Sequence, residues 1–392
     1  MKYSRYVIVG GGMAADAAVL GIRSVDQSGT ISIICDELDP PYDRPPLSKS
    51  LWKDKPFESI WRKTAAQNID LHLGRKAVSL DTTEKTVTDD AGDVYGYDRL
   101  LLATGGSPRL LPDADDGVIY FRTAADYLRL RAMCEHGKNF VVIGGGFIGS
   151  EVAAALAMNG KHVTMVFPSN GIGSRVYPPA LMNFLNGYFE EKGVTLLAAE
   201  TVKSVRKMSG RMKVTTGSGR EIVADGVVAG LGIQPNTALA EQAGLKVDNG
   251  IVVDELLRSS DRDIYAAGDV ANFHSAALDM RMRVEHEDNA NMMGKLAGRN
   301  MARQSDIYSH QPYFYSDLFD LGYEAVGELD SGMDIVEDWQ DPFRKGVVYY
   351  LRDGRVRGVL LWNTWGQVAA ATELIAEKAQ YNSETLKGLI RD

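Results

Sequence analysis

The segment FVVIGGGFIGSE at residues 140–151 places the strongest constraint on how this chain can fold. Its apolar, β-branched start predicts a buried parallel strand. Gly144, Gly146 and Gly149 then follow in G-x-G-x-x-G spacing, as an apolar helix begins at Phe147. Such a turn lets the backbone approach a pyrophosphate, and the helix N-terminus supplies unpaired N–H groups. The alternative for this segment alone is a glycine-rich turn that binds nothing.

The same pattern occurs near the N-terminus. The apolar run Tyr6–Val9 is followed by Gly10 and Gly12, with Ala15 at the third position, where the fingerprint also accepts alanine. Two strand–turn–helix sites in one chain are hard to explain without ligands. The sequence therefore predicts an α/β protein with two Rossmann-like domains, each of which binds a dinucleotide.

Composition narrows the remaining possibilities. The 392 residues suffice for two or three domains. The net charge is −9 and no basic run occurs, so nucleic acid is not an expected partner. No apolar stretch approaches the roughly 18 residues of a membrane span, and the first strand leaves no room for a signal peptide. We expect a cytoplasmic protein.

The two cysteines, Cys35 and Cys134, lie far apart and not in a C-x-x-C pair. This excludes a redox-active dithiol of the thioredoxin-reductase type and an all-cysteine zinc or iron–sulfur site. No metal site is expected. Both residues are interpreted as small buried apolar side chains.

The first Rossmann unit continues with a helix over Met13–Ser24 and a strand over Thr30–Cys35. Asp36 and Glu37 end this strand, where an acid can accept hydrogen bonds from an adenosine ribose. We favour Asp36 over Glu37 for that role. The alternative is that both are surface carboxylates.

The loop PPYDRPPLSK, residues 40–49, contains four prolines, which fix φ and remove backbone donors. It is therefore expected to be rigid. Arg44 and Lys49 on such a loop could hold positive charge against a cofactor, although a solvated lysine on a structural turn is the alternative.

Two further turns are expected to approach the first nucleotide. After a predicted meander over Arg75–Tyr97, the strand Arg99–Ala103 runs into Thr104 and Gly105. A later strand ends at Gly268-Asp269 before an expected helix. There Asp269 either hydrogen-bonds the polyol hydroxyls of a flavin or caps that helix.

The second Rossmann unit has its second strand over His162–Phe167. An acid at its end would indicate NAD, and a cluster of arginines NADP. Neither is present in the sequence that follows, so the choice stays open. Gly232, in the GIQPN segment that closes the unit, is included among the cofactor-binding candidates.

The C-terminal part begins with a long helix within Val284–Met301 that carries Glu285 and His286 near its start. A third domain follows from Pro312, with a linker between Asp330 and Gly346. Its expected strands and its final helix are 314–318, 324–329, 346–351, 356–362 and 368–380.

The PYDRPPLSK loop, the ATG turn, the second fingerprint ending in Glu151 and the AAGDV turn stand in the order found in flavin-dependent pyridine nucleotide oxidoreductases. Nearly the whole chain resembles the ferredoxin-reductase branch of that family. The segments VFPSNGIGSRVYP, RVEHEDNA, YSDLFDLGYEAVG and VVYYLRDGRVRGVLLWN resemble the apoptosis-inducing factors more closely still, in a bacterial-type form.

The resemblance implies a glutathione-reductase-like fold with three parts. Residues 1–112 and 245–307 would form an FAD-binding domain, and residues 113–244 an NAD(P)H-binding domain. Residues 308–392 would form an α+β domain that covers the flavin.

The resemblance also implies roles for single residues. Lys49 would approach flavin N5 and pair with Glu151, Phe147 would shield the nicotinamide, and Glu285 and His286 would line the opposite side. Lys49, Glu151, Phe147 and His286 are the catalytic candidates. One departure is Tyr315, which stands where these families usually have tryptophan.

The predicted activity is hydride transfer from NAD(P)H, with NADH favoured, to FAD. Electrons would then pass to a ferredoxin or rubredoxin, a quinone or another acceptor. The alternative is an NADH-responsive redox sensor like the apoptosis-inducing factors, with a long-lived charge-transfer complex and a redox-dependent homodimer. A third hypothesis is a structural flavoprotein whose FAD only stabilises the fold.

Overall fold

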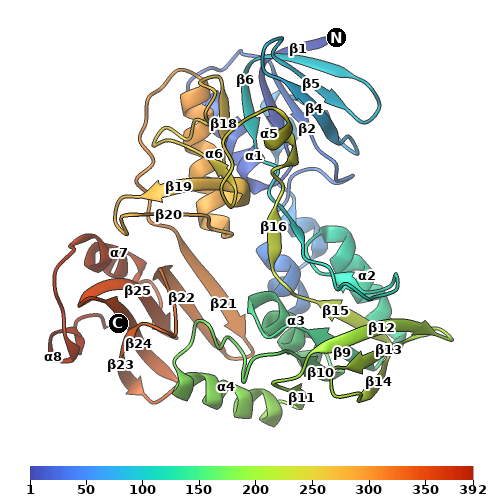
Figure 1. The fold of residues 1–392 in the computed structure, drawn as a ribbon, viewed down its shortest axis with the longest axis vertical. Helices are drawn as coiled ribbons and strands as arrows, with labels where there is room; N and C mark the ends of the chain where they lie inside the picture. The colour runs from blue at the N-terminus through green and yellow to red at the C-terminus, as the bar shows by residue number, and fades with distance from the viewer. Residues whose placement is uncertain (392) are drawn as a thin grey trace. The chain divides into compact units, whose positions relative to one another are not determined.

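The computed structural model describes residues 1–391, which form two compact units. Each unit is assembled from three stretches of chain (Figure 1). Unit 1 comprises Met1–Arg44, Phe57–Ser107 and Gln234–Pro312. Unit 2 comprises Pro45–Pro56, Pro108–Ile233 and Tyr313–Asp392. The predicted division into three domains stays a prediction.

Unit 1 is built on a seven-stranded sheet in the order β3-β2-β1-β6-β5-β4, in which β18 also pairs with β6. Five strands of this sheet run parallel to one another, namely β3, β2, β1, β6 and β18. Strand β5 pairs antiparallel with both β4 and β6. Such a parallel sheet fits the predicted Rossmann unit. The strands are β1 (Lys2–Val9), β2 (Ile31–Ile34), β3 (Asp70–His72), β4 (Ala77–Asp81), β5 (Thr86–Asp89), β6 (Val94–Leu102) and β18 (Ile264–Ala266).

Strand β6 differs from the prediction, which separated a meander from the core strand. It is continuous and pairs parallel with β1 over nearly its whole length. On its other side, its first half pairs antiparallel with β5 and its second half pairs parallel with β18. The polar residue Asp98 at its centre does not interrupt it, because that side chain faces solvent and accepts a hydrogen bond from Tyr3.

The other elements of unit 1 lie around this sheet. They are α1 (Met13–Arg23), η3 (Phe57–Ile60), η4 (Thr64–Gln67), α5 (Ala238–Gln242), β17 (Ile251–Val252), η5 (Gly268–Val270), β19 (Ala271–Ser275), β20 (Met280–Met282) and α6 (Glu287–Met301). The expectation of a helix directly after Asp269 was wrong. Gly268 begins a single 3-10 turn, and strand β19 follows it.

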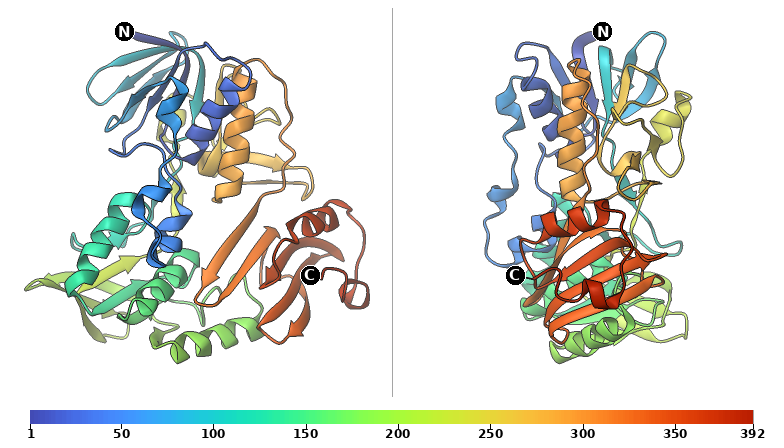
Figure 2. Two further views of the ribbon diagram at one scale, coloured as in Figure 1. Left: turned by 180° about the vertical axis from the view of Figure 1, so that it is seen from behind. Right: turned by 90° about the vertical axis from the view of Figure 1, so that its left-hand side faces the viewer.

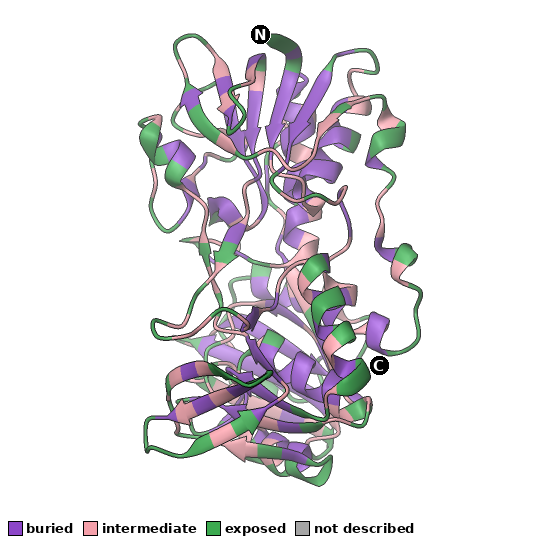
Figure 3. Cartoon of the chain, turned by 90° about the vertical axis from the view of Figure 1, so that its right-hand side faces the viewer, coloured by how far each residue is buried: buried purple, intermediate pink, exposed green. Residues whose placement is uncertain are grey.

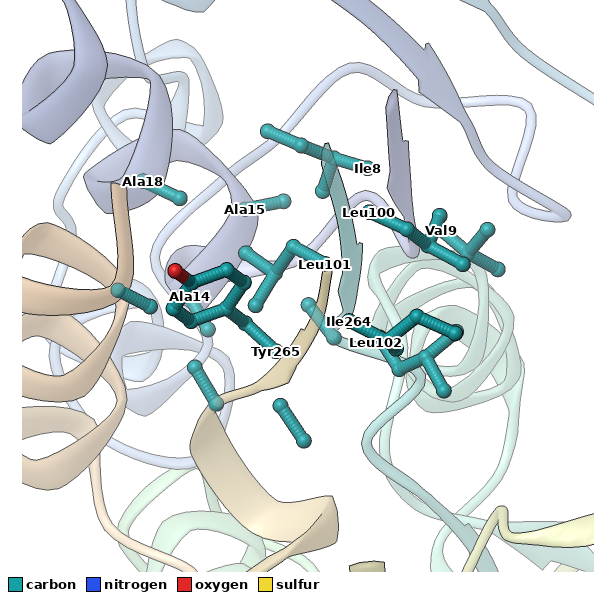
Figure 4. Packing of buried hydrophobic residues seen from close by; sticks show 14 of the residues in the cluster. Ile8, Val9, Ala14, Ala15, Ala18, Leu100, Leu101, Leu102, Ile264 and Tyr265 are labelled. Carbon is teal, nitrogen blue, oxygen red and sulfur yellow. The ribbon is translucent and has the colours of Figure 1, made fainter. Parts of the chain in front are cut away.

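The core of unit 1 lies between the sheet and α1. Figure 4 shows Ile8, Leu101 and Ile264 from three neighbouring strands beside the small side chains of Ala14 and other alanines of α1. Because alanine adds little bulk, α1 can approach the strands closely and leave the turn before it at the edge of the sheet.

Helices α1 and α6 lie side by side (Figure 2), and glycines let their backbones approach. A Cβ atom on Gly294 would lie 2.2 Å from the Ala14 carbonyl oxygen, and one on Gly298 would lie 2.1 Å from the Ala18 carbonyl oxygen. No side chain fits at either position without separating the helices.

Unit 2 contains a five-stranded parallel sheet in the order β11-β10-β9-β15-β8 and an antiparallel sheet in the order β12-β13-β14. Strands β9 and β10 are mostly buried, and Figure 3 shows how buried and exposed residues are distributed along the chain. The elements are η1 (Pro45–Ser48), η2 (Ser50–Trp52), β8 (Ile119–Tyr120), α2 (Ala124–His136), β9 (Asn139–Ile143), α3 (Phe147–Met158), β10 (His162–Val166), α4 (Pro179–Glu191), β11 (Val194–Leu197), β12 (Val202–Met208), β13 (Arg211–Thr216), β14 (Glu221–Ala224) and β15 (Gly226–Ala229).

The C-terminal part of unit 2 is an antiparallel sheet in the order β21-β22-β25-β24-β23. Its elements are β21 (Tyr313–Leu318), β22 (Leu321–Gly327), β23 (Asp334–Asp341), β24 (Lys345–Arg352), β25 (Arg355–Trp362), α7 (Val368–Ala376) and α8 (Ser383–Leu386). Short strands β7 (Gly106–Pro108) and β16 (Ile233–Pro235) pair where the chain passes from one unit to the other.

Two expectations for this part were wrong. The linker predicted between Asp330 and Gly346 contains β23, an edge strand. The helix expected over 368–380 is α7, which ends at Ala376 instead of Gln380, since Lys378 adopts a left-handed conformation with φ of 55°. No helix within residues 1–391 is long and apolar enough to cross a membrane.

We predict that Gly294→Ala lowers the free energy of unfolding by about 1–3 kcal/mol, because the added methyl group overpacks the contact between α1 and α6. Urea unfolding followed by circular dichroism measures the change. Gly187→Ala on α4 is the matched control, since no atom lies within 4 Å of a Cβ placed at that position and the helix gains up to about 1 kcal/mol. Equal stability of the Gly294→Ala protein and wild type would contradict the close approach.

Candidate functional site

The two glycine-rich turns have the same backbone geometry. Gly10 and Gly144 have φ of 114° and 116°, a region that L side chains rarely adopt. A Cβ on Gly10 would lie 2.1 Å from the Ala103 carbonyl oxygen, and one on Gly144 would lie 2.3 Å from the Gly230 carbonyl oxygen. The protein itself therefore requires glycine at the first fingerprint position of both turns.

The second fingerprint position is different. Gly12 and Gly146 directly precede α1 and α3, and their φ values of −91° and −86° are ordinary. No atom lies within 4 Å of a Cβ placed on Gly146, and the nearest to one on Gly12 is an Arg44 nitrogen at 4.0 Å. Neither turn contains a side-chain cap for its helix. Both turns thus leave open space and helix N–H groups where a pyrophosphate would lie, and they fit a dinucleotide.

The third fingerprint position packs helix on strand. Ala15 is fully buried in unit 1. In unit 2, a Cβ on Gly149 would lie 2.0 Å from the Gly144 carbonyl oxygen. Glycine is therefore needed at the third position of the second turn, and alanine suffices in the first.

At the end of β2, Glu37 is the carboxylate that other side chains hold in place. It accepts a 2.6 Å hydrogen bond from the Tyr42 hydroxyl and forms an ion pair with Arg44. Asp36, which the sequence favoured, is exposed. Arg44 also approaches Gly12, so Glu37 and Arg44 are both positioned beside the first turn.

Arg44 also interacts electrostatically with Asp269. Burial opposes its charge, but Tyr42, Glu37 and Asp269 together hold the pKa of Arg44 above its ordinary value. The backbone carbonyl of Asp269 accepts a 3.0 Å hydrogen bond from Arg283. A charged network thus links Arg44 to the turn after β18.

The turn after β6 is fixed by Asn236. The Asn236 side chain donates to the Thr104 carbonyl at 2.8 Å, and the Thr104 hydroxyl donates to the Asn236 carbonyl at 2.8 Å. Gly105 has φ of 60° and accepts from the Asn236 N–H at 3.0 Å. Sequence analysis singled out the GIQPN segment, which contains Asn236, but it did not predict that Asn236 would hydrogen-bond Thr104 and Gly105.

Strand β10 ends without an acid. The Phe167 ring lies against Gly145, and the Ser169 hydroxyl donates to the Gly171 carbonyl at 3.0 Å. Gly232 has φ of 78° and accepts from the Arg109 N–H at 2.9 Å. These contacts leave the choice between NADH and NADPH open, as the sequence did.

Lys49 and Glu151 form a buried ion pair in unit 2. The Lys49 ammonium lies 2.7 Å from Glu151 Oε2, and their side chains are only 10% and 3% exposed. The same oxygen accepts a 2.6 Å hydrogen bond from the Ser48 hydroxyl, and Oε1 accepts one of 2.6 Å from the Ser316 hydroxyl. The contact expected from the resemblance is present, but neither serine was predicted.

Two buried tyrosines stand behind Ser316. Tyr323 lies directly opposite it on β22, and Tyr177 donates to the Tyr323 hydroxyl at 3.0 Å. Burial, with the nearby Glu151 charge, raises the pKa of both Tyr177 and Tyr323. Both phenols therefore stay protonated at neutral pH.

Aromatic rings surround the same part of unit 2. Phe147, the first residue of α3, packs on Phe314 with ring centroids 5.2 Å apart. Tyr315, where the family usually has tryptophan, lies with its ring 5.3 Å from the Lys49 ammonium. Tyrosine thus supplies an aromatic face to the lysine in this chain.

In unit 1, Glu285 and His286 lie at the start of α6. His286 is the N-cap residue and makes no side-chain cap hydrogen bond. Glu285 forms a 2.8 Å ion pair with Arg283. Their roles toward a nicotinamide stay predictions.

Cys35 and Cys134 are both free and buried. Burial raises the pKa of Cys35 to about 11 and also raises that of Cys134. Their thiols therefore stay protonated near neutral pH and are poor nucleophiles.

Comparison with known proteins identifies the same features. The family model described as Pyridine nucleotide-disulphide oxidoreductase matches residues 4–294. A second model, described as Apoptosis-inducing factor, mitochondrion-associated, C-term, matches residues 297–340 and 335–377. Together these matches extend over most of the chain.

The chain is similar both to an apoptosis-inducing factor and to putidaredoxin reductase. The chain is 34% identical to mitochondrial apoptosis-inducing factor 1 of Dictyostelium discoideum, over 95% of the chain and 78% of that protein. It is 35% identical to putidaredoxin reductase of Pseudomonas putida, over 90% of the chain and 87% of that protein. A crystal structure of the covalent putidaredoxin reductase–putidaredoxin complex matches with a TM-score of 0.91 at 32% identity, over 98% of this chain and 95% of that one.

We predict that Glu151→Ala destabilises the protein by about 3–5 kcal/mol, because Lys49 would be left buried without its counter-charge. Urea unfolding of the purified variant measures this loss. Glu221→Ala is the matched control in unit 2, since its pair with Lys213 is exposed and contributes about 0–1 kcal/mol. Similar losses in the two variants would argue against a buried pair.

Proposed function

Since the chain belongs to the pyridine nucleotide-disulphide oxidoreductase family, we propose that it oxidises NADH and passes the electrons to a small iron–sulfur or rubredoxin-type protein. The chain is a flavoprotein oxidoreductase that uses FAD and NAD(P)H. When bound, FAD accepts a hydride from the nicotinamide and delivers electrons to an acceptor. NADH as the preferred donor and a cytoplasmic location are parts of this proposal.

In the proposed assignment, the turn at Gly10 and Gly12 holds the FAD pyrophosphate. Glu37, in place of Asp36, accepts hydrogen bonds from the adenosine ribose, because Tyr42 and Arg44 already orient its carboxylate. Arg44 supplies positive charge beside the turn. Thr104, Gly105 and Asp269 would hold the remaining parts of FAD by hydrogen bonds.

The turn at Gly144 and Gly146 holds the nicotinamide nucleotide in this assignment. Phe147 would shield its ring, and Lys49 would present a positive charge to the flavin. Glu151 supplies the counter-charge of that lysine and fixes its position, since an unpaired ammonium would be costly at a buried place. These residues position and polarise the reacting groups without acting as acid or base.

The observation that carries the proposal is the open space at Gly12 and Gly146. Their φ values do not require glycine, and no protein atom crowds either position. Glycine at both places is explained by ligands that approach the backbone.

The acceptor is proposed from the relatives. Putidaredoxin reductase and a rubredoxin-NAD(+) reductase, both of Pseudomonas putida, are among the similar proteins. The absence of a paired thiol in the sequence is consistent with electrons that leave the flavin directly. A redox sensor is the second candidate, favoured by the match of the C-terminal sheet to the apoptosis-inducing factor model.

We predict that Gly146→Val raises the KM for NADH at least about tenfold, which corresponds to about 1.4 kcal/mol of lost binding. The new side chain would occupy the space proposed for the pyrophosphate, while the protein itself has room for it. Steady-state kinetics with a dye acceptor measure KM, and the flavin absorbance measures FAD content, which should not change.

Gly187→Val is the control for this substitution, since it adds the same side chain at an open helical glycine outside the turn. Its KM should equal that of wild type. An unchanged KM in Gly146→Val would refute the assignment of the second turn.

A stopped-flow experiment distinguishes the candidate functions. Under anaerobic conditions we expect NADH to bleach the flavin rapidly, and a ferredoxin or rubredoxin to reoxidise it promptly. A persistent long-wavelength absorbance with slow reoxidation would favour the sensor instead. Absence of bleaching with both NADH and NADPH would reject both and leave a structural flavoprotein.

A further inference from the structure

Glu151 is held by more than its lysine. Lys49 and Ser48 both contact Oε2, whereas the donor to Oε1 is the Ser316 hydroxyl at 2.6 Å. Glu151 and Ser316 are 3% and 1% exposed, so water does not replace this hydrogen bond easily. The orientation of the carboxylate therefore depends on a residue of the C-terminal sheet.

Ser316 stands opposite a buried tyrosine in the sheet. A hydroxyl group has one proton, and Ser316 uses it to donate to Glu151. Directly opposite Ser316 lies Tyr323, whose hydroxyl accepts from Tyr177 at 3.0 Å. The serine proton is therefore committed to the carboxylate.

The strand register makes this arrangement specific. Ser316 and Tyr323 are directly opposed on β21 and β22, and the Tyr323 ring stacks on the buried Trp362 of β25, with centroids 5.5 Å apart. The sheet thus fixes the position from which Ser316 donates to Glu151.

We propose that Ser316 is a positioning residue that fixes the Glu151 carboxylate against Lys49 and so sets the positive charge presented to the flavin. The inference rests on the proposed function, in which Lys49 lies beside the flavin. It adds that the C-terminal sheet adjusts the reduction potential through a serine that does not touch the cofactor.

The test is an equilibrium redox titration of the full-length holoprotein, with a chemical reductant and a reference dye in place of NADH. Without Ser316, Glu151 should neutralise Lys49 less completely, and a more positive site favours uptake of electrons. In Ser316→Ala we expect a tenfold shift of the two-electron equilibrium toward the reduced form, which is about 30 mV. Ser316→Thr keeps the hydroxyl and should restore the wild-type potential.

Ser331→Ala is the matched control. The Ser331 hydroxyl also donates a hydrogen bond within unit 2, to the Ser174 carbonyl at 2.7 Å, but does not contact Glu151. Its potential should equal that of wild type. An unchanged potential in Ser316→Ala, an equal shift in Ser331→Ala, or no recovery in Ser316→Thr would each overturn the proposal.

A second measurement follows the ion pair without using the flavin. The rate at which an amine-reactive reagent labels Lys49, read by peptide mass spectrometry, should rise severalfold in Ser316→Ala and stay unchanged in Ser331→Ala. If Ser316→Ala does not fold, Ser316→Cys, whose thiol is a weaker donor, should change both quantities in the same direction by less, and no change there overturns the proposal. Wild type that NADH fails to reduce would reject the proposed function alone, because neither measurement uses NADH.

Discussion

A buried, ion-paired carboxylate connects distant segments of unit 2. Glu151 lies almost fully buried near the start of α3, and an ionised group there is tolerated only when its lone pairs are all engaged. Its donors come from segments far apart in sequence, Ser48 and Lys49 in one loop and Ser316 in the C-terminal sheet. Satisfying this one side chain brings three distant stretches of chain together.

The two glycine-rich turns separate requirements of the fold from requirements of the ligand. At Gly10 and Gly144 a positive φ and a nearby carbonyl oxygen already exclude other residues, so these glycines say nothing about binding. At Gly12 and Gly146 the protein makes no such demand. A fingerprint written as one pattern therefore contains two kinds of glycine, and only one kind carries information about nucleotides.

Much of this architecture follows from local sequence. Apolar runs bounded by glycine gave the parallel strands and both turns, because burial and positive φ leave few alternatives. Strand β23 was missed, since its sequence DIVEDWQD is polar and lies at a sheet edge. Glu37 was ranked below Asp36 because the partners that orient it, Tyr42 and Arg44, become neighbours only in the folded loop. Ser316 was not noticed at all, because a serine acquires this role only from strand register and burial.

The interleaving of the two units affects how the chain can fold during synthesis. Unit 1 receives β18 and α6 from its third stretch, Gln234–Pro312, long after β1, α1 and β6 have left the ribosome. Until then, β6 is paired with β1 but lacks its second parallel neighbour β18, and α1 lacks the glycine-bearing helix α6 that packs against it. Since domains tend to fold as units from the N-terminus, a nascent chain of about half length exposes an unpaired strand edge and an apolar helix surface. The need for chaperones should therefore be greatest in the middle of translation.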